Sequence, residues 1–322
     1  MRQVMIHKFG SRDVMRVEDV PAPSAAGGEI LIDVHYAGLN PLDYKMRDGS
    51  SGLAAKMQLP CSLGREFVGT VTSGPQTLLY QHGLKEGDRV FGMRPHSDLR
   101  GTYAEQITID PSCVAPVPEE VDDADLPFFG GLALVGLTAI QTIRDAQVAQ
   151  GDVVLIHGGA GGVGQLLIQM ALQAGAERVF ATGRAANASR IKELGAIAIP
   201  YDGVNWREAI NEHTDDRGVD VVIDTHYFKT FLPSLDHLVD GGRIVALPTL
   251  ADLTPAKERG FHAATPTIAP DRMLLDKLAE GFADGRLQLE VSEVLPLGDV
   301  AYGHQQLESG HTRGKLILDV RA

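Results

Sequence analysis

The sequence predicts an α/β fold in which a doubly wound parallel sheet interrupts a second, β-rich domain. Residues 1–118 consist of short apolar runs separated by Gly and Pro, a pattern typical of β-structure. Between residues 126 and 248 strands alternate with helices, which indicates a parallel sheet covered by helices. Because 322 residues exceed one ordinary hydrophobic core, two domains are expected.

The first region is predicted to contain strands wherever a short apolar run lies between turn residues. These runs are residues 30–36, 67–73, 89–93 and 102–109.

The central region is predicted to follow a strand-helix rhythm. The expected strands are residues 153–157, 179–182, 197–200, 219–224 and 243–248, and the expected helices are residues 162–173 and 187–194.

The last region, after about residue 249, has a third pattern. A helix beginning at Asp271 places Leu274, Leu278 and Phe282 on one face. An apolar run at residues 287–291 and a final strand at residues 315–320 follow, and this region is expected to complete the first domain.

Composition restricts the partners that the chain can have. Lys and Arg number 29 against 42 Asp and Glu, a formal charge of −13 that disfavours nucleic acid and anionic lipid. Cys61 and Cys113 are too few for a disulfide framework or a four-cysteine zinc site. The N-terminus lacks a signal-like apolar run, and no stretch reaches the ~20 apolar residues that span a bilayer. We therefore expect a cytoplasmic protein without nucleic-acid or membrane partners.

A glycine-rich turn carries the strongest chemical signal. Gly159, Gly161 and Gly164 form the pattern G-x-G-x-x-G directly after a β-branched run and directly before a helix. The first glycine is expected to permit a tight turn, the second to let the backbone approach a pyrophosphate, and the third to let helix and strand pack closely. The helix amides then face the anion. The alternative is a glycine-rich turn without a ligand.

The end of the following strand predicts NADP(H) rather than NAD(H). An NAD-binding sheet places an acid there, whereas this chain has Thr182, Gly183 and Arg184. Hydroxyl and guanidinium groups, with Arg190 nearby, suit a 2′-phosphate through charge-assisted hydrogen bonds. The alternative for Arg190 and Lys192 is a solvated helix face.

Nine motifs in order resemble the zinc-independent medium-chain dehydrogenase/reductase family, in its quinone oxidoreductase or zeta-crystallin-like and alkenal reductase branch. They are HYAGLNPLDYKMRDG (35–49), LPCSLGREFVGTV (59–71), GDRVFG (87–92), GTYAEQ (101–106), GLTAIQTI (136–143), the glycine-rich turn, GVDVVIDT (218–225), GGRIVAL (241–247) and RGKLILDV (313–320).

The resemblance implies a GroES-like catalytic domain from residues 1–122 and 253–322, a Rossmann NADP(H)-binding domain from residues 123–252, and a homodimer.

Two departures from the family pattern bear on the chemistry. Asn40 and Arg65 stand where zinc-dependent relatives carry a Cys and a His, and the four-cysteine lobe is missing, so no metal site is expected. Asp224, Thr225 and His226 replace a small Val-Gly-Gly turn, and His226 with Tyr227 is expected to reshape the nicotinamide side of the pocket.

Asn40, Asp43, Tyr44 and Lys45 are expected to lie on one short loop. The resemblance also assigns the site residues. It places Asn40 beside the nicotinamide and Lys45 near the cofactor, with Tyr44 displaced by one position from the Tyr of other quinone reductases. Alternatives are a turn role for Asn40 and simple packing for Tyr44; Glu66 is interpreted as mainly structural. The expected catalytic residues are Asn40, Tyr44 and Lys45, and the expected cofactor-binding residues are Asn40, Lys45, Thr138, Gly159, Ala160, Gly161, Gly162, Val163, Gly164, Thr182, Gly183, Arg184, Arg190, Leu247 and Lys315.

The resulting hypothesis is hydride transfer from NADPH to a quinone or an α,β-unsaturated carbonyl. A proton from water, Tyr44 or Lys45 then completes the reduction. Two alternatives stay open: an enoyl-thioester reductase, which calls for a basic patch near the cleft, and a non-catalytic NADPH-binding or structural protein. The sequence does not determine the physiological substrate, the proton donor or the oligomeric state.

Overall fold

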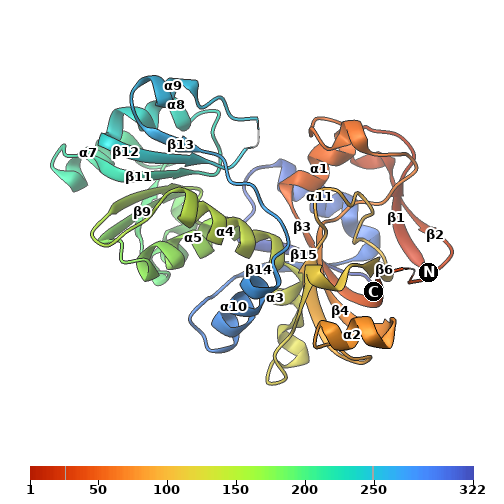
Figure 1. The fold of residues 1–322 in the computed structure, drawn as a ribbon. Coiled ribbons are helices and arrows are strands. Elements are labelled where there is room, and N and C mark those ends of the chain that lie inside the picture. The colour runs from red at the N-terminus through yellow and green to blue at the C-terminus, as the bar shows by residue number, and fades with distance from the viewer. Residues whose placement is uncertain (26, 249) are drawn as a thin grey trace. The chain divides into compact units, whose positions relative to one another are not determined.

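The computed structural model describes residues 1–25, 27–248 and 250–322 (Figure 1). The chain forms two compact units. Unit 1 consists of Met1–Leu137 and Ala269–Ala322, and unit 2 consists of Thr138–Ile268. The predicted domain boundaries, after residues 122 and 252, lie upstream of both divisions and stay predictions for the functional domains.

The main sheet of unit 1 joins both ends of the chain. Its strand order is β14-β15-β3-β4-β5-β7, with β6 paired to β3. The antiparallel pairing of β15 with β3 brings the last strand beside the first long one, as the family resemblance implies. The strands are β3 (Ile30–Leu39), β4 (Glu66–Ser73), β5 (Arg89–Met93), β6 (Gln106–Ile109), β7 (Val114–Pro116), β14 (Val291–Pro296) and β15 (Lys315–Asp319).

A hairpin and several helices complete unit 1. The hairpin pairs β1 (Arg2–Ile6) with β2 (Met15–Asp19). The helices are α1 (Pro41–Asp48), α2 (Gln76–Gln81), α3 (Leu126–Gly130), α10 (Arg272–Ala283) and α11 (Val300–Glu308), together with the beginning of α4 (Ala133–Asp145). Apolar residues from β1, β3, β4 and β15 share one buried core.

The sheet of unit 2 is parallel throughout and has the strand order β10-β9-β8-β11-β12-β13. This is the order of a doubly wound dinucleotide-binding sheet. The strands stay parallel, but successive strands are added outward on opposite sides of the point between β8 and β11. The strands are β8 (Val153–His157), β9 (Arg178–Gly183), β10 (Ile197–Pro200), β11 (Val219–Asp224), β12 (Leu238–Ala246) and β13 (His262–Ala264). The predicted fold class is confirmed.

The helices of unit 2 follow its strands along the chain. They are α5 (Gly162–Gln173), α6 (Ala188–Glu193), α7 (Trp206–Thr214), α8 (Phe231–Ser234) and α9 (Thr254–Glu258), besides the rest of α4. Leu166, Leu167 and Ile168 of α5 are buried, so this helix is held firmly on the sheet.

Several predicted boundaries were wrong. Within the predicted strand 102–109, only β6 is a strand, because the amide of Val4 bonds to the carbonyl of Tyr103 and ties this segment to β1 instead. Strand β12 begins five residues before the predicted residue 243 at Leu238. In the run 287–291, Leu287 and Leu289 are buried in a connecting segment, and the strand itself starts at Val291.

No single helix among the described residues is both long and apolar enough to cross a bilayer. One bent pair of helices, residues 123–130 with 133–145, is long and apolar enough when the two are taken together, by length and composition only.

Candidate functional site

Helix α1 carries Tyr44 and Lys45, and Asn40 lies directly before it, so the predicted short loop is a capped helix. Asn40 precedes the helix with extended backbone, and Pro41 occupies its first position. The amide of Asn40 donates to Asp43 Oδ2 over 2.7 Å, and Gly49, with φ of 88°, ends the helix. These capping signals were present in the sequence and were missed.

A buried cluster surrounds the side chain of Asn40. Asn40 Nδ2 donates to Glu66 Oε1 over 2.8 Å. Lys315 Nζ donates to Asn40 Oδ1 over 2.8 Å and to Glu66 Oε1 over 2.7 Å. The exposed fractions are 2% for Asn40, 0% for Glu66 and 3% for Lys315, so an ion pair removed from water holds the Asn40 amide on both sides.

Glu66 joins more of unit 1 than any predicted site residue. Its second oxygen, Oε2, accepts the amide of Leu134 near the beginning of α4, where a negative charge is favoured by the helix dipole. A Cβ at Gly38 would lie 2.5 Å from Glu66 Oε1, so the neighbouring strand must have glycine there. Glu66 thereby links β3, β4, α1, α4 and β15.

Asp43 is a fully buried carboxylate beside this cluster. Its Oδ2 accepts the Tyr103 hydroxyl over 2.7 Å, while its Oδ1 has no hydrogen-bond partner. Burial raises the pKa of Asp43 to about 6, against the opposing effects of the Tyr103 and Asn40 hydrogen bonds and the charges of Lys315 and Arg65.

Tyr44 and Lys45 follow Asp43 on α1 and are both half-buried. The ammonium of Lys45 lies 6.0 Å from the centre of the Tyr44 ring. Burial raises the pKa of Tyr44, with smaller contributions from the charges of Asp48 and Glu308, so its phenol stays protonated at neutral pH. Within the described residues Lys45 forms no ion pair.

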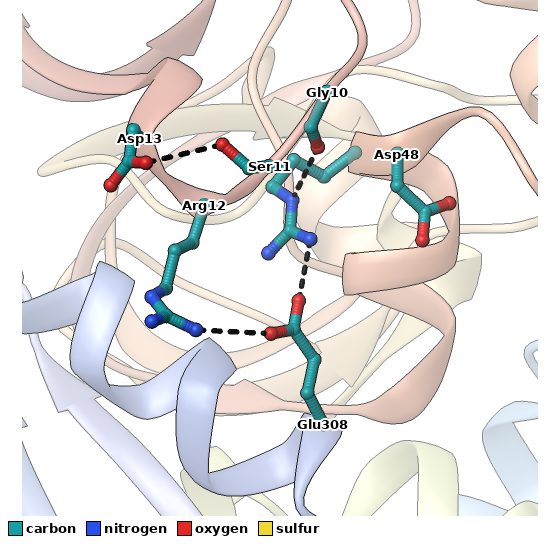
Figure 2. Close-up of a pocket in the computed structure, with 7 residues that line it drawn as sticks. Gly10, Ser11, Arg12, Asp13, Asp48 and Glu308 are labelled. Atoms are coloured by element: carbon teal, nitrogen blue, oxygen red, sulfur yellow. Dashed lines mark hydrogen bonds and ion pairs between the residues drawn. The ribbon is translucent and has the colours of Figure 1, made fainter.

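The C-terminal end of α1 borders a polar hollow of about 370 Å³ (Figure 2). The buried Arg47 guanidinium donates to the carbonyl of Gly10 and to His304 Nδ1, and pairs with Glu308. The hollow contains none of the predicted site residues. The contacts of Arg47 hold the C-terminal end of α1, as those of Asn40 hold its beginning.

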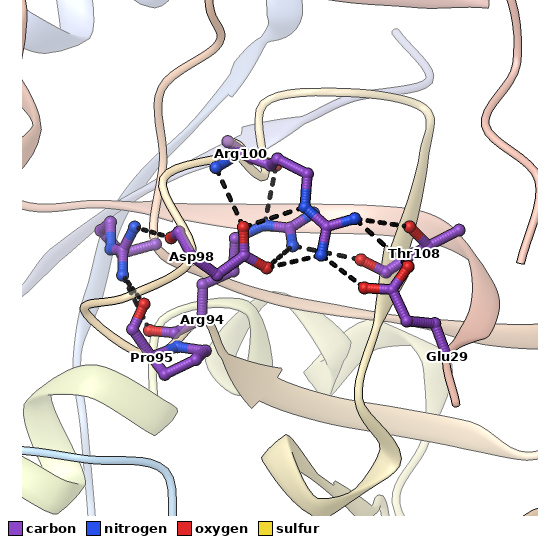
Figure 3. A network of polar contacts seen from close by, with 8 residues as sticks. Glu29, Arg94, Pro95, Asp98, Arg100 and Thr108 are labelled. Atoms are coloured by element: carbon purple, nitrogen blue, oxygen red, sulfur yellow. Dashed lines mark hydrogen bonds and ion pairs between the residues drawn. The ribbon is translucent and has the colours of Figure 1, made fainter. Parts of the chain in front are cut away.

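Arg65 supports the loop that follows β5, and Figure 3 labels Arg94, Pro95, Asp98 and Arg100 of this loop. Arg65 is 1% exposed and donates to the carbonyls of Arg94, Pro95 and Asp98. Arg94 and Arg100 both pair with Asp98 from the same loop. Arg65, at the position where zinc-dependent relatives have a ligating His, therefore holds this loop by donating to the loop's backbone carbonyls.

In unit 2 the glycine-rich turn joins β8 to α5. The left-handed φ of 83° falls on Gly158, so the tight turn is one residue earlier than predicted. A Cβ at Gly159 would lie 2.6 Å from that of Ala181, and one at Gly164 would lie 2.1 Å from the carbonyl oxygen of Gly158. A Cβ at Gly161 would meet only that oxygen, at 3.5 Å. Gly159 and Gly164 thus permit close packing, whereas Gly161 leaves the backbone accessible to a ligand.

Thr182 and His157 hold this turn from beneath. Thr182 Oγ1 accepts the amide of Gly158 and lies 3.2 Å from His157 Nδ1, while His157 Nε2 lies 2.9 Å from the Ser234 hydroxyl. Burial lowers the pKa of His157 to about 4, so the imidazole is neutral at pH 7. The Thr182 hydroxyl stabilises the turn in this arrangement.

Arg184 follows Gly183 at the carboxyl end of β9 and is exposed. The amide of the next residue, Ala185, donates to Asp202, so this carboxylate already has a partner. Arg190 donates to Gln165 Oε1 over 3.3 Å and lies 3.5 Å from Glu193. Arg190 is therefore tied towards α5, whereas Arg184 is available to an anion.

The remaining predicted residues fall on the same two units. Thr138 is a buried residue of α4 and the first residue of unit 2. Leu247 directly follows β12, and its amide donates to the carbonyl of Asp224. Ala160, Gly162 and Val163 lie in the glycine-rich turn and the first turn of α5.

The structure gathers the predicted residues into two groups. Asn40, Tyr44, Lys45 and Lys315 lie in unit 1, and the other predicted cofactor-binding residues lie in unit 2. Sequence reasoning missed the central position of Glu66 and the partners of Asp43. The segment LGRE, with a Glu among apolar and Gly residues, was the available signal for a buried carboxylate.

The donor set does not fit zinc. Among the described residues no group of three or more His, Cys, Asp or Glu is placed to hold a metal ion. The Asn40 amide is saturated by Glu66 and Lys315, and Arg65 offers only N–H donors.

The dinucleotide-binding features fit a phosphate-bearing cofactor better. Gly161 leaves the turn open, the first turn of α5 presents amides without helical partners, and the Arg184 guanidinium is exposed.

Two family models match the sequence. The model described as an alcohol dehydrogenase GroES-like domain matches residues 26–119, and the model described as a zinc-binding dehydrogenase matches residues 194–318.

Curated relatives match nearly the whole chain, and two of them illustrate the range of named activities. The probable quinone oxidoreductase of Schizosaccharomyces pombe is 30% identical over 98% of this chain and 96% of its own. The chloroplastic NADPH-dependent alkenal/one oxidoreductase of Arabidopsis thaliana is 28% identical over 99% of this chain and 79% of its own.

Solved structures share the fold over 99% of this chain, among them two quinone oxidoreductases. The quinone oxidoreductase of Coxiella burnetii has a TM-score of 0.92 and 34% identity, with 99% of its chain covered. The Escherichia coli quinone oxidoreductase, solved in complex with NADPH, has a TM-score of 0.87 and 26% identity, with all of its chain covered.

Proposed function

Because the chain belongs to the medium-chain dehydrogenase/reductase family, in the branch of the quinone oxidoreductases, we propose that this oxidoreductase uses NADPH to reduce quinones or α,β-unsaturated carbonyls. The observation that carries the proposal is the glycine-rich turn at the switch point of a parallel sheet, with Arg184 rather than an acid after β9. The E. coli relative solved with NADPH and the Arabidopsis alkenal/one oxidoreductase support the cofactor and the substrate range.

In unit 2, Gly161 and the first amides of α5 would hold the pyrophosphate, and Arg184 would pair with the 2′-phosphate. Bound NADPH supplies the hydride for the electrophilic carbon of the substrate. Thr182 and His157 keep the turn in shape from beneath.

In unit 1, the proposal separates residues that position from residues that donate. Asn40 has both amide groups bonded within the domain, so it defines the local shape and polarity, with Lys315 and Glu66 fixing its orientation. Tyr44 Oη and Lys45 Nζ are the candidate donors of the proton that completes reduction of an enone. The cofactor contact of Lys315 stays a prediction, since its ammonium already has three oxygen partners, including the carbonyl of Leu39.

The substrate class is tested by the loss of NADPH absorbance with benzoquinone, phenanthrenequinone, crotonaldehyde, a long-chain enone and crotonyl-CoA. Turnover of quinones or of enals and enones supports the proposal and chooses between the classes. Turnover of crotonyl-CoA alone would favour an enoyl-thioester reductase. NADPH binding without turnover of any compound would contradict the proposed activity.

The cofactor choice is tested by Arg184→Glu. Reversing the charge beside a 2′-phosphate is expected to lower the NADPH/NADH ratio of kcat/KM by about tenfold or more. Lys257→Glu reverses another exposed charge of unit 2, on helix α9, and serves as the matched control. An unchanged ratio in Arg184→Glu would remove Arg184 from the site.

We also propose that the chain forms a homodimer, as the resemblance implies. Size-exclusion chromatography with light scattering tests this, and a monomer at micromolar concentration would contradict it.

A further inference from the structure

His226 lies directly on the glycine-rich turn. Strands β8 and β11 are parallel neighbours, with His157 opposite Asp224, so the segments after them leave the sheet side by side. The Thr225 hydroxyl donates to the carbonyl of His157 over 2.8 Å. A Cβ at Gly158 would lie 2.9 Å from His226 Nε2. The imidazole therefore rests against the backbone at the start of the turn.

The backbone of His226 is positioned by a loop that Asp224 holds with hydrogen bonds. The Asp224 side chain accepts the amides of His226 and Tyr227 over 2.9 Å and 2.8 Å, and both of its oxygens accept the Thr230 hydroxyl. Tyr227 has a left-handed φ of 70° that this carboxylate helps to hold. Within the described residues neither ring nitrogen of His226 has a hydrogen-bond partner. The backbone of the loop is therefore held by Asp224, while the exposed His226 side chain keeps its ring nitrogens free of partners in the described part of the chain.

Two ionisable groups face the His226 ring from the strands beneath it. Asp224 on β11 is negative and favours a protonated imidazole, and His157 on β8 is neutral because burial lowers its pKa to about 4. Packing of the ring against the turn outweighs Asp224 and lowers the pKa of His226. The lowered pKa favours the uncharged imidazole at neutral pH.

We propose that His226 couples dinucleotide binding to proton uptake, with the imidazole taking up a proton when a pyrophosphate binds at the glycine-rich turn. The inference rests on the proposed use of NADPH. An added phosphate charge beside the ring favours imidazolium, and by linkage the protonated protein binds the pyrophosphate more tightly. The sign follows: affinity rises as the pH falls through the pKa of His226 in the complex and levels off below its pKa in the free protein.

The test measures the dissociation constant of NADPH by nicotinamide fluorescence at about pH 6 and about pH 8.5. Proton uptake is measured by calorimetry in buffers of different ionisation enthalpy. Between about pH 8.5 and about pH 6, the dissociation constant of the wild type is expected to fall about fivefold more than that of His226→Gln. The Gln side chain is polar but does not titrate. His226→Ala is the second variant, and it is expected to behave like His226→Gln.

Adenosine 2′-phosphate is the control ligand, because it carries the 2′-phosphate but no pyrophosphate. Its affinity is expected to show no difference between wild type and His226→Gln at either pH. Equal pH dependence and equal proton uptake with NADPH in wild type and both variants would overturn the role of His226. Absence of NADPH binding to the wild type at both values of pH would instead overturn the proposed function, and this inference with it.

Discussion

The two units treat polar groups in opposite ways. Unit 1 buries the ion pair of Lys315 with Glu66 and uses their hydrogen bonds to hold Asn40. Unit 2 leaves space beside the backbone of Gly161, and its Arg184 is exposed. Buried charges in unit 1 are committed to internal structure, whereas the turn in unit 2 keeps donors available. The polar groups of unit 1 therefore stabilise its own fold, whereas Arg184 of unit 2 stays available to a ligand.

Breaking the ion pair of unit 1 has the largest expected effect. Lys315→Met leaves the charge of Glu66 buried without its partner, which is expected to lower the free energy of unfolding by about 3 to 5 kcal/mol. Glu66→Gln combined with Lys315→Met removes both charges and is expected to recover part of this loss. Denaturant unfolding measures the free energy of unfolding of the wild type, the single variant and the double variant.

Lys192→Met, which removes an exposed lysine of unit 2, is the matched control, with an expected change within about 0.5 kcal/mol. If Lys315→Met were as mild as Lys192→Met, the framework role of the buried pair would be wrong.

Two glycines sharpen the contrast within the turn. Gly164→Ala forces a methyl group against the carbonyl oxygen of Gly158, where a Cβ would lie only 2.1 Å away, and is expected to cost about 1 to 3 kcal/mol of stability. Gly161→Ala has room for its methyl group, so its stability is expected to stay within about 0.5 kcal/mol of wild type.

Both glycine variants are expected to bind NADPH at least about tenfold more weakly, Gly161→Ala because the methyl group keeps the pyrophosphate from the backbone. Unfolding and NADPH titration separate the two effects. Normal NADPH binding by a folded Gly161→Ala protein would contradict the assignment of an open ligand-binding position.

Asp43 gives the smallest effect, and it depends on pH. Its pKa is raised to about 6 in the folded protein, so protonation favours folding between that value and the lower pKa of the unfolded chain. Wild-type stability is expected to fall, relative to Asp43→Asn, by about 1 to 2 kcal/mol as the pH rises from about 4 to about 7. Unfolding midpoints across this range measure the difference.

Asp48→Asn removes an exposed carboxylate from the same helix and is the control. If the stability difference between Asp43→Asn and wild type stayed constant with pH, burial would not raise the pKa of Asp43 in the folded protein.

The local pattern of residues was enough to predict the central sheet. Strands 153–157, 197–200 and 219–224 and helix 162–173 occur with the predicted bounds. Their periodicity is local, and buried parallel strands read as continuous apolar runs. Residues 41–48 form helix α1 and not the predicted loop, because Asn40 and Asp43 cap its beginning and Gly49 ends it.

By itself, the sequence determined the parallel sheet, the glycine-rich turn and the absence of an acid where NAD-binding sheets have one. Only the tertiary structure decided that Asn40, Glu66 and Lys315 form one cluster, since Lys315 is separated from Asn40 by 275 positions along the chain. It also decided that His226 lies on Gly158. Periodicity and turn chemistry depend on near neighbours, whereas contacts between distant residues are selected by the packing of the whole unit, which balances burial against hydrogen bonding and charge.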